Sequence, residues 1–152
     1  MSNCKGTDDG PAALARIGDY ITDSVLPIFK SGQADLIGDE HMLASDIALE
    51  TAPGHTPGLT LVRLSGGRHE GIVCSDLMHH PLQVRYPTWS TRFCVDPDQA
   101  RLTRIEFFKK HADSGRLVFP THFPTPTGGM IARDGAEYDF VFDGEARSAI
   151  RA

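Results

Sequence analysis

Residues 59–75 read LTLVRLSGGRHEGIVCS, which is two short apolar runs separated by a Gly-Gly pair. Runs rich in Leu, Val and Ile favour β-strands, and a Gly-Gly pair is typical of the tight turn between two antiparallel strands. We therefore predict strands over residues 59–64 and 71–75 that together form a hairpin. This hairpin makes β structure the centre of the expected fold.

The region before the hairpin has helical spacing first and strand character later. Pro27 interrupts the helical pattern, so we expect one helix to end near Asp23 and a second to begin there, with Asp23 or Ser24 as its N-cap. Gly32 would close this helical region, and residues 47–51 are expected to form a short strand. The apolar positions of the helical stretch are spaced by three and four residues: Leu14, Ile17, Ile21, Val25 and Ile28.

The region after the hairpin contains the clearest helix signal, over residues 96–115. Asp96 can cap the helix, Pro97 suits the first helical position and Gln99 can complete a capping box. Gly115 supplies a stop signal at the other end. The buried stripe of this helix is expected to consist of Leu102, Ile105, Phe108 and Ala112.

The segments on either side of this helix are expected to be a loop and further strands. Residues 81–93 contain two prolines and scattered aromatic residues, which favours an ordered loop. The run RLVFP predicts a short buried strand, and residues 129–144 alternate in a way that predicts a hairpin turning at Asp134 and Gly135. The order of helix, strands, helix and strands predicts an α/β protein.

Composition limits the chain to one ordinary globular domain. The chain has 152 residues, of which 40% are hydrophobic, and this is enough for a single core. Residues 1–10 are polar and are expected to form a loose N-terminus, and residues 11–152 are expected to form the domain. The three cysteines lack a C-x-x-C pair, so we expect plain thiols, with Cys74 in the core.

Charge and hydropathy exclude several classes of partner. The formal net charge is −5, and Lys and Arg do not cluster into the positive stripe that nucleic acid binding requires. The apolar runs are far shorter than the roughly 20 residues that span a bilayer, and the N-terminus lacks a signal-peptide pattern. We therefore expect a cytoplasmic protein that binds neither nucleic acid nor a membrane.

Three polar residues follow the predicted strands and form a candidate metal site. His55 comes after the strand that ends near residue 51, Asp76 follows GIVCS and His122 follows RLVFPT. Loops at strand ends are positions where a rigid sheet can direct side chains toward a common point. Neutral imidazole and carboxylate are ligand types that suit zinc, iron or manganese. The alternative is that each histidine is an ordinary surface or hydrogen-bonded residue.

Three motifs, TAPGHTPG, CSDLMHHPLQ and FPTHFP, carry a resemblance to a known family. In order and context they resemble the C-terminal portion of the metallo-β-lactamase superfamily of metal-dependent hydrolases, in particular its lactonase-like members, over about residues 12–142. The resemblance implies part of an αββα sandwich, with a mainly antiparallel sheet and flanking helices. It also implies zinc, with His55 on a first metal, His122 on a second and Asp76 bridging both, for hydrolysis of a small ester or lactone.

The chain departs from that family in one large respect. The family's leading H-x-H-x-D-H signature is absent, because none of the seven histidines is followed two residues later by another. Each metal would then keep two protein ligands, whereas catalytic zinc normally has three. An incomplete sandwich would also expose an apolar face that a homo-oligomer or a complementing chain would cover. The alternative to a hydrolase is therefore a truncated, non-catalytic remnant or interaction module that needs a partner chain.

Two further groups of residues have open interpretations. His79 and His80 follow Asp76 closely and would line a substrate pocket, supply a replacement ligand or simply be exposed loop histidines. Aromatic residues of the 81–93 loop would form an apolar wall for a small-molecule substrate such as an acyl chain, or fill the core beneath the loop: Tyr86, Trp89 and Phe93.

Overall fold

The structure is a computed structural model that describes residues 20–67 and 69–144, and the chain divides into two compact units, 1–38 and 39–152. The described part of the first unit is helical, with a π-helical segment η1 (Ile21–Val25) followed by α2 (Leu26–Lys30). Pro27 lies in the first turn of α2, where the missing N–H is tolerated. Gly32, at φ +70°, follows the helix as expected.

The prediction of separate helices meeting near Asp23 is wrong in detail. The chain passes directly from π to α winding, so the N-cap position of α2 is Val25, and neither Asp23 nor Ser24 caps it. Pro27 lies at the start of the α-wound part of this run, where its fixed φ suits the helix. The expected loose segment 1–10, Cys4, Leu14 and Ile17 lie outside the described residues.

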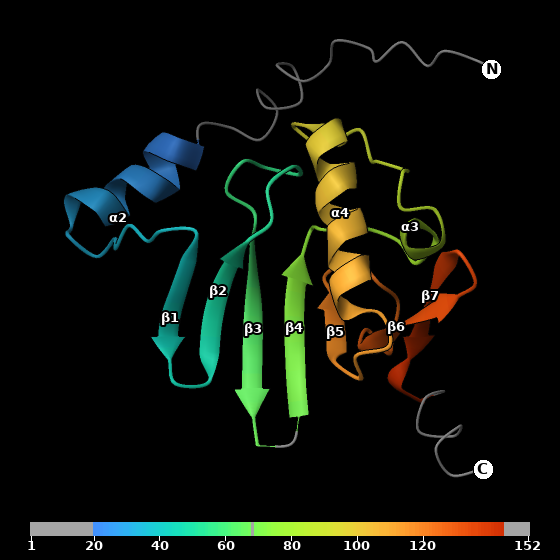
Figure 1. The fold of residues 1–152 in the computed structure, drawn as a ribbon. Helices are drawn as coiled ribbons and strands as arrows, with labels where there is room; N and C mark the ends of the chain where they lie inside the picture. Colours follow the sequence, from blue (N-terminus) through green and yellow to red (C-terminus); the bar gives the residue numbers. More distant parts are fainter. Residues whose placement is uncertain (1–19, 68, 145–152) are drawn as a thin grey trace. The chain divides into compact units, whose positions relative to one another are not determined.

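The second unit contains a seven-stranded sheet whose strands lie in chain order (Figure 1). Neighbouring strands are antiparallel, except that β4 and β5 are parallel. The predicted strand over 47–51 and both predicted hairpins are confirmed. The strands are β1 (Glu40–Ala44), β2 (Ile47–Thr51), β3 (Thr60–Gly66), β4 (His69–Ser75), β5 (Leu117–Pro120), β6 (Gly129–Asp134) and β7 (Glu137–Phe142).

Sequence reasoning missed β1. All five of its residues are exposed, so it has no alternation of buried and exposed side chains that would mark it as a strand. It forms because it pairs with β2 at the edge of the sheet.

Two helices lie in the connection between the parallel strands β4 and β5. A single turn, α3 (Leu82–Arg85), occupies the segment expected to be a loop, and α4 (Pro97–His111) is the helix expected after Asp96. The Asp96 side chain accepts a hydrogen bond from the Gln99 backbone N–H at 2.9 Å, which confirms the predicted cap.

The predicted buried stripe of α4 is partly wrong. Phe108 is fully buried, but Leu102 is 60% exposed. Two of the buried positions of α4 are polar residues, so the apolar spacing in the sequence does not mark the buried face of the helix. The buried residues are Ala100, Arg104, Phe107, Phe108 and His111.

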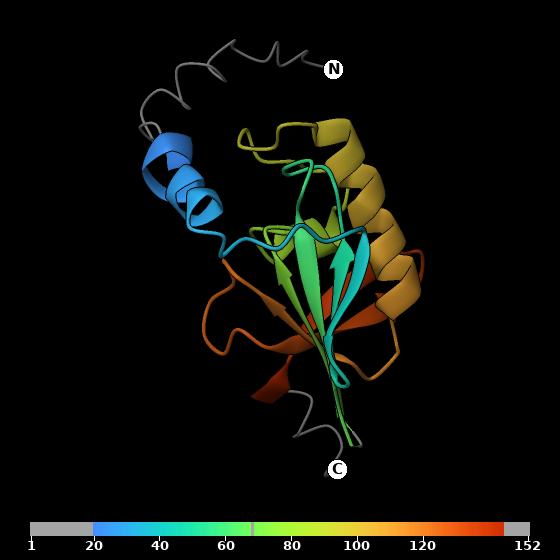
Figure 2. The same cartoon turned by 90° about the vertical axis from the view of Figure 1, so that its left-hand side faces the viewer.

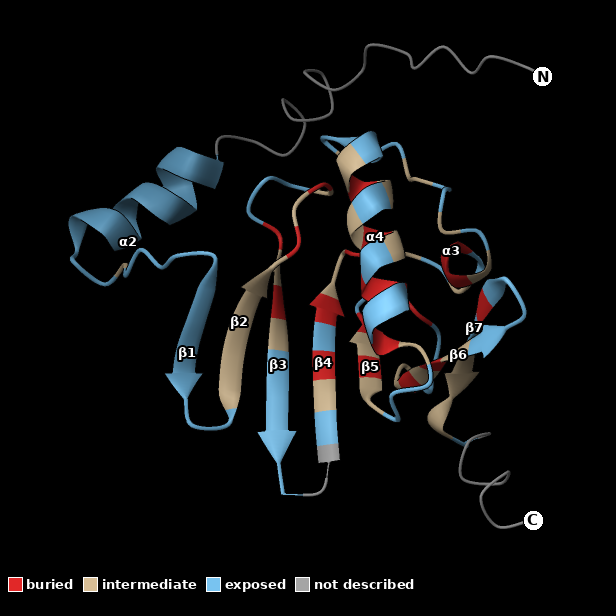
Figure 3. Ribbon diagram, viewed as in Figure 1, coloured by how far each residue is buried: buried red, intermediate tan, exposed pale blue. Residues whose placement is uncertain are grey.

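The core of the second unit lies between α4 and one face of the sheet (Figure 3). Phe107 and Phe108 of the helix share this core with buried strand residues, so the strands contribute every second side chain to it. The expected burial of Cys74 is confirmed, since its side chain is completely inaccessible. The strand residues are Leu61, Ile72, Cys74, Val118, Ile131 and Tyr138.

The opposite face of the same strands is also apolar. Register places Leu49, Val62, Val73 and Phe119 in one row across β2, β3, β4 and β5, and a second row runs parallel to it. We call the apolar residues of these two rows the open face, because each is half-buried or exposed and α4 lies on the other side of the sheet (Figure 2). A solvated sheet face normally carries polar residues, so the open face is suited to contact with another protein layer. Its members are Ile47, Leu49, Val62, Leu64, Val73, Leu117 and Phe119.

Candidate metal centre

Strand direction brings the three expected ligands to one edge of the sheet. Strands β2, β4 and β5 run the same way, because β3 is antiparallel to both β2 and β4, and β4 is parallel to β5 (Figure 1). Their C-terminal ends therefore lie at the same edge. His55 follows β2, Asp76 comes directly after β4, and His122 follows β5.

Asp76 lies between two histidines and contacts one with each carboxylate oxygen. His55 Nε2 lies 3.2 Å from Asp76 Oδ2, and His122 Nε2 lies 3.1 Å from Asp76 Oδ1. The side chain of His55 is 14% exposed and that of His122 is 47% exposed, so the site opens to solvent on the His122 side. The expected residues thus meet around one carboxylate.

The Pro-Gly turn that presents His55 is fastened to the start of α4. The backbone N–H of Val95 donates to the His55 carbonyl at 2.9 Å, and the hydroxyl of Thr103 donates to the Pro53 carbonyl at 2.6 Å. Gly54 has φ +138° and packs so closely on Ala100 that any side chain at Gly54 would overlap the Ala100 backbone. The glycine is therefore required for this placement of His55.

Cys94 contacts the other nitrogen of the His55 ring. Its Sγ lies 3.8 Å from His55 Nδ1, and the Thr91 hydroxyl lies 3.7 Å from the same sulfur. A partner on Nδ1 favours a ring orientation that leaves Nε2 directed at Asp76. Cys94 was not expected at the site, because its distance in sequence from His55 gives no signal.

Ser75 sets the direction of the chain into Asp76. It has φ +46°, a backbone region that residues other than glycine use sparingly, and the pairing of β4 with β5 is irregular at this point. Unusual backbone conformations of this kind concentrate at functional sites. The strand thus ends on a local kink directly before its carboxylate.

His79 is a further member of the cluster, and its role was left open by the sequence. Its ring centroid lies 4.9 Å from that of His55 and 5.0 Å from that of His122. The His79 Nδ1 atom is buried and has no hydrogen-bond partner among the described residues. Burial lowers the pKa of His79 below its usual 6.5, and the neighbouring His55 lowers it further, which favours the neutral ring that binds metals.

The position of His79 is fixed by a buried glutamine. The His79 backbone N–H donates to Gln83 Oε1 at 2.6 Å, and Gln83 Nε2 donates to the Trp89 carbonyl at 2.9 Å. Arg104 of α4 donates to the same carbonyl at 2.7 Å. These contacts tie the segment after Asp76 to the core, so His79 is held in place rather than free to turn away.

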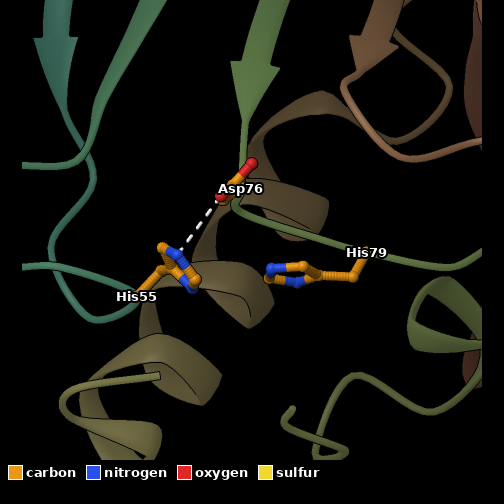
Figure 4. A group of neighbouring side chains, drawn as sticks. All are labelled: His55, Asp76 and His79. Atoms are coloured by element: carbon orange, nitrogen blue, oxygen red, sulfur yellow. Dashed lines mark ion pairs between the residues drawn. The ribbon is translucent and has the colours of Figure 1, made fainter. Parts of the chain in front are cut away.

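The donor set fits a divalent metal such as zinc. One ligand atom from each of His55, Asp76 and His79 lies within 4.8 Å of the other two, and Figure 4 shows both rings directed toward the space beside the carboxylate. Imidazole nitrogen and carboxylate oxygen are common zinc ligands. An unpaired buried imidazole nitrogen at this place is also a group that a metal ion would satisfy.

His80 and the aromatic residues of the 81–93 segment lie at the surface. His80 is exposed, and its Nδ1 accepts a hydrogen bond from the Leu82 backbone N–H at 3.1 Å. The rings of Tyr86 and Trp89 are stacked with centroids 4.7 Å apart, and both are exposed together with Phe93. The prediction that these aromatic residues fill the core is therefore wrong, and the apolar wall for a substrate stays a prediction.

No helix in the described part of the chain is long and apolar enough to cross a membrane.

A scan against known protein families finds no family that matches the chain, and a search of curated proteins finds no match either. Comparison with solved structures does find similar folds. One is AidC, a dizinc quorum-quenching lactonase solved in complex with a product, at 24% identity and TM-score 0.71. The match covers 93% of this chain and 50% of AidC.

Two other structures agree with this similarity. The hydrolase AbOPH, of the beta lactamase superfamily, matches at 20% identity and TM-score 0.74, over 90% of this chain and 47% of its own. A probable metal-dependent hydrolase from Staphylococcus aureus matches at 15% identity and TM-score 0.59, over 74% of this chain and 40% of its own. The chain thus spans at most about half the length of these proteins. Over that length, it has the fold of the metallo-β-lactamase superfamily.

Proposed function

We propose that this chain contributes the metal site of a metal-dependent hydrolase that acts on a small ester or lactone. The observation that carries the proposal is the contact of one carboxylate, Asp76, with His55 on one oxygen and His122 on the other. Similarity of fold to a dizinc lactonase supports the same reaction class.

The proposed ligands are His55, Asp76 and His122, and zinc is the proposed metal. A zinc ion held there would act as a Lewis acid on the carbonyl group of the substrate and would activate a water molecule. The contribution of the chain is to fix the ligands. Cys94 orients the His55 ring, and the Pro-Gly turn packed on α4 limits its movement.

A second protein layer on the open face is part of this proposal. This layer would cover the two rows of apolar side chains across β2 to β5. The same layer would bring the remaining metal ligands to the sheet edge. The layer would come from a complementing chain or from a second copy of this one.

The open face also favours a second candidate function, that of a non-catalytic interaction module. In that case the chain would bind a partner through the open face and the histidine cluster would hold no metal. Metal content separates the two functions, because only the hydrolase requires a metal.

Elemental analysis of the purified full chain for zinc, manganese and iron tests the proposal. A variant that combines His55→Ala, Asp76→Ala and His122→Ala is the comparison, and His80→Asn controls for the loss of a histidine, since an asparagine retains an acceptor for the Leu82 N–H. We expect zinc in the wild type and His80→Asn proteins and little in the triple variant. Equal, near-zero metal in all three would favour the interaction module.

Activity is tested separately. The full chain would be assayed for lactone and ester hydrolysis alone and after mixing with the part of AidC that the match does not cover. The proposal predicts a gain in rate on mixing that the triple variant does not give. No gain, together with bound zinc in the wild type, would count against a complementing layer but not against the metal site.

A further inference from the structure

We propose that His55, Asp76 and His79 bind one zinc ion as a three-ligand set, and that His122 stays outside this set. The proposal rests on the metal site proposed above and changes its ligands. The family resemblance implies that His55 binds one metal, His122 binds another and Asp76 bridges both. Each metal would then have only two protein ligands. The described residues offer a better arrangement.

Distances favour the three-ligand set. Two ligands of a tetrahedral zinc with bonds of about 2.0–2.1 Å lie about 3.3 Å apart. His55 Nε2 and Asp76 Oδ2 are 3.2 Å apart, so they already have this spacing. His79 extends this pair to a group in which one ligand atom from each residue lies within 4.8 Å of the other two. His122 Nε2 has a similar spacing to Asp76 Oδ1, at 3.1 Å, but no third ligand atom among the described residues joins that pair.

Ring orientation separates His79 from His122. The two rings are stacked with an angle of 10° between their planes. Imidazole nitrogens bind metals through lone pairs in the ring plane, so two nearly parallel stacked rings do not converge on one ion. His55 and His79 are tilted by 49°, which allows their nitrogens to converge (Figure 4).

Burial also distinguishes the two candidates for the third ligand. The His122 side chain is 47% exposed, and its Nε2 has Asp76 as a partner. The His79 Nδ1 atom is buried without a partner among the described residues. A buried polar atom without a partner is unfavourable, and a metal ion bound to His79 Nδ1 would supply the missing partner. Gln83 holds the backbone of His79, so little reorganisation is needed.

The set has the composition of a catalytic zinc site, with three protein ligands and a place for water. His122 would then act on the carboxylate. By donating from Nε2 to the free oxygen of Asp76, it would hold the carboxylate so that its other oxygen faces the ion. His122 is a positioning residue in this arrangement.

Calorimetric titration of the metal-free full chain with zinc tests the proposal. The wild type should bind one zinc ion per chain. His79→Ala should weaken binding by roughly tenfold or more, as should His55→Ala, because each removes one of three ligands. His122→Ala should have the smaller effect, and His80→Asn should bind as the wild type does. The order of these affinities is the result to compare.

Each outcome decides a separate point. Wild-type binding by His79→Ala would overturn the three-ligand set while leaving the proposed metal site intact, and so would two zinc ions per chain. Absence of zinc binding in the wild type would overturn both. If His79→Ala does not fold, NMR of the ring nitrogens in the wild type gives the answer. Zinc should shift the nitrogens of His55 and His79 and leave those of His80 in place; an unshifted His79 would overturn the proposal.

Discussion

Gly54 packs directly against the backbone of Ala100, at the point where the turn that carries His55 meets the first turn of α4. The Gly54 carbonyl oxygen also accepts a hydrogen bond from the Asp96 backbone N–H, at 3.0 Å. The helix cap and the candidate ligand are therefore parts of one local structure.

Replacing Gly54 with alanine should disturb both stability and metal binding. The new methyl group would overlap Ala100, and φ +138° is unfavourable for alanine. We expect a loss of about 2–4 kcal/mol in the free energy of unfolding and weaker zinc binding. Gly58→Ala is the matched control in the same turn, since a methyl group there meets nothing within 4 Å. Equal stability of the two variants in urea unfolding would contradict this role of Gly54.

Cys94 should affect zinc binding without being a ligand. Cys94→Val removes the contact of its sulfur with His55 Nδ1 and should weaken zinc affinity by roughly tenfold, which is typical of groups that orient a metal ligand. Cys94→Ser keeps a polar partner and should stay closer to the wild type. Calorimetric affinities of the two variants, measured under reducing conditions, provide the comparison. A valine variant with unchanged affinity would show that His55 needs no such partner.

Arg104 should be a major source of stability for the segment after Asp76. Its fully buried side chain donates to the carbonyls of Leu77, Pro87 and Trp89 at 2.7–2.9 Å. Arg104→Met would remove the arginine's hydrogen bonds to all three carbonyls, of which only that of Trp89 keeps a bond described above, from Gln83. The substitution should cost about 3 kcal/mol or more in the free energy of unfolding.

Arg101→Met serves as the control for the Arg104 prediction. Arg101 pairs with Asp98 at the surface of α4, and exposed ion pairs contribute about 0–1 kcal/mol. Thermal unfolding of both variants would be compared. Similar melting temperatures would mean that the buried arginine is replaceable.

His111 should make the protein less stable as the pH falls. Burial lowers the pKa of His111 to about 4 from an ordinary value of 6.5, with Lys110 and Arg116 adding to the effect. Between pH 6.5 and about 4, His111 is therefore protonated in the unfolded chain but stays neutral in the folded chain, so acidification favours unfolding. The stability lost over this window should be roughly 2–3 kcal/mol.

Urea unfolding between pH 6.5 and 4 checks this prediction in the wild type and in His111→Gln. The substitution removes the titrating group while other groups continue to contribute. The variant should lose less stability on acidification than the wild type. Identical losses would contradict the assignment of a neutral, buried His111.

Local sequence signals predicted most of the sheet and the start of α4, whereas the helix ends at His111, before the expected stop at Gly115. The Gly-Gly hairpin, the strand over 47–51 and the Asp96 cap each depend on residues close together in the chain, so periodicity and capping rules find them. Strand β1 was missed because its formation depends on pairing with β2. The buried face of α4 was predicted wrongly at Leu102, because the face that is actually buried contains the charged residue Arg104. Arg104 can be buried because its hydrogen-bond partners lie in a distant loop, which the local sequence does not reveal.

The candidate site was predictable only in part. Positions after strand ends identified His55, Asp76 and His122, because parallel direction brings such positions to one edge. His79 and His80 are adjacent in sequence, and nothing local says which one turns inward. The structure distinguishes them through Gln83, whose side chain binds the His79 backbone and is itself held by Trp89.

The zinc affinity of Asp76→Asn, measured by competition with a chromophoric chelator, tests the proposed metal centre directly. Asp76 is the residue that contacts both His55 and His122, and asparagine keeps its shape while removing its charge. We predict a loss of zinc affinity of roughly a hundredfold with little change in the unfolding temperature, because charge on the ligand matters to the metal and not to the core. Zinc affinity equal to that of the wild type would contradict a metal centre built around Asp76.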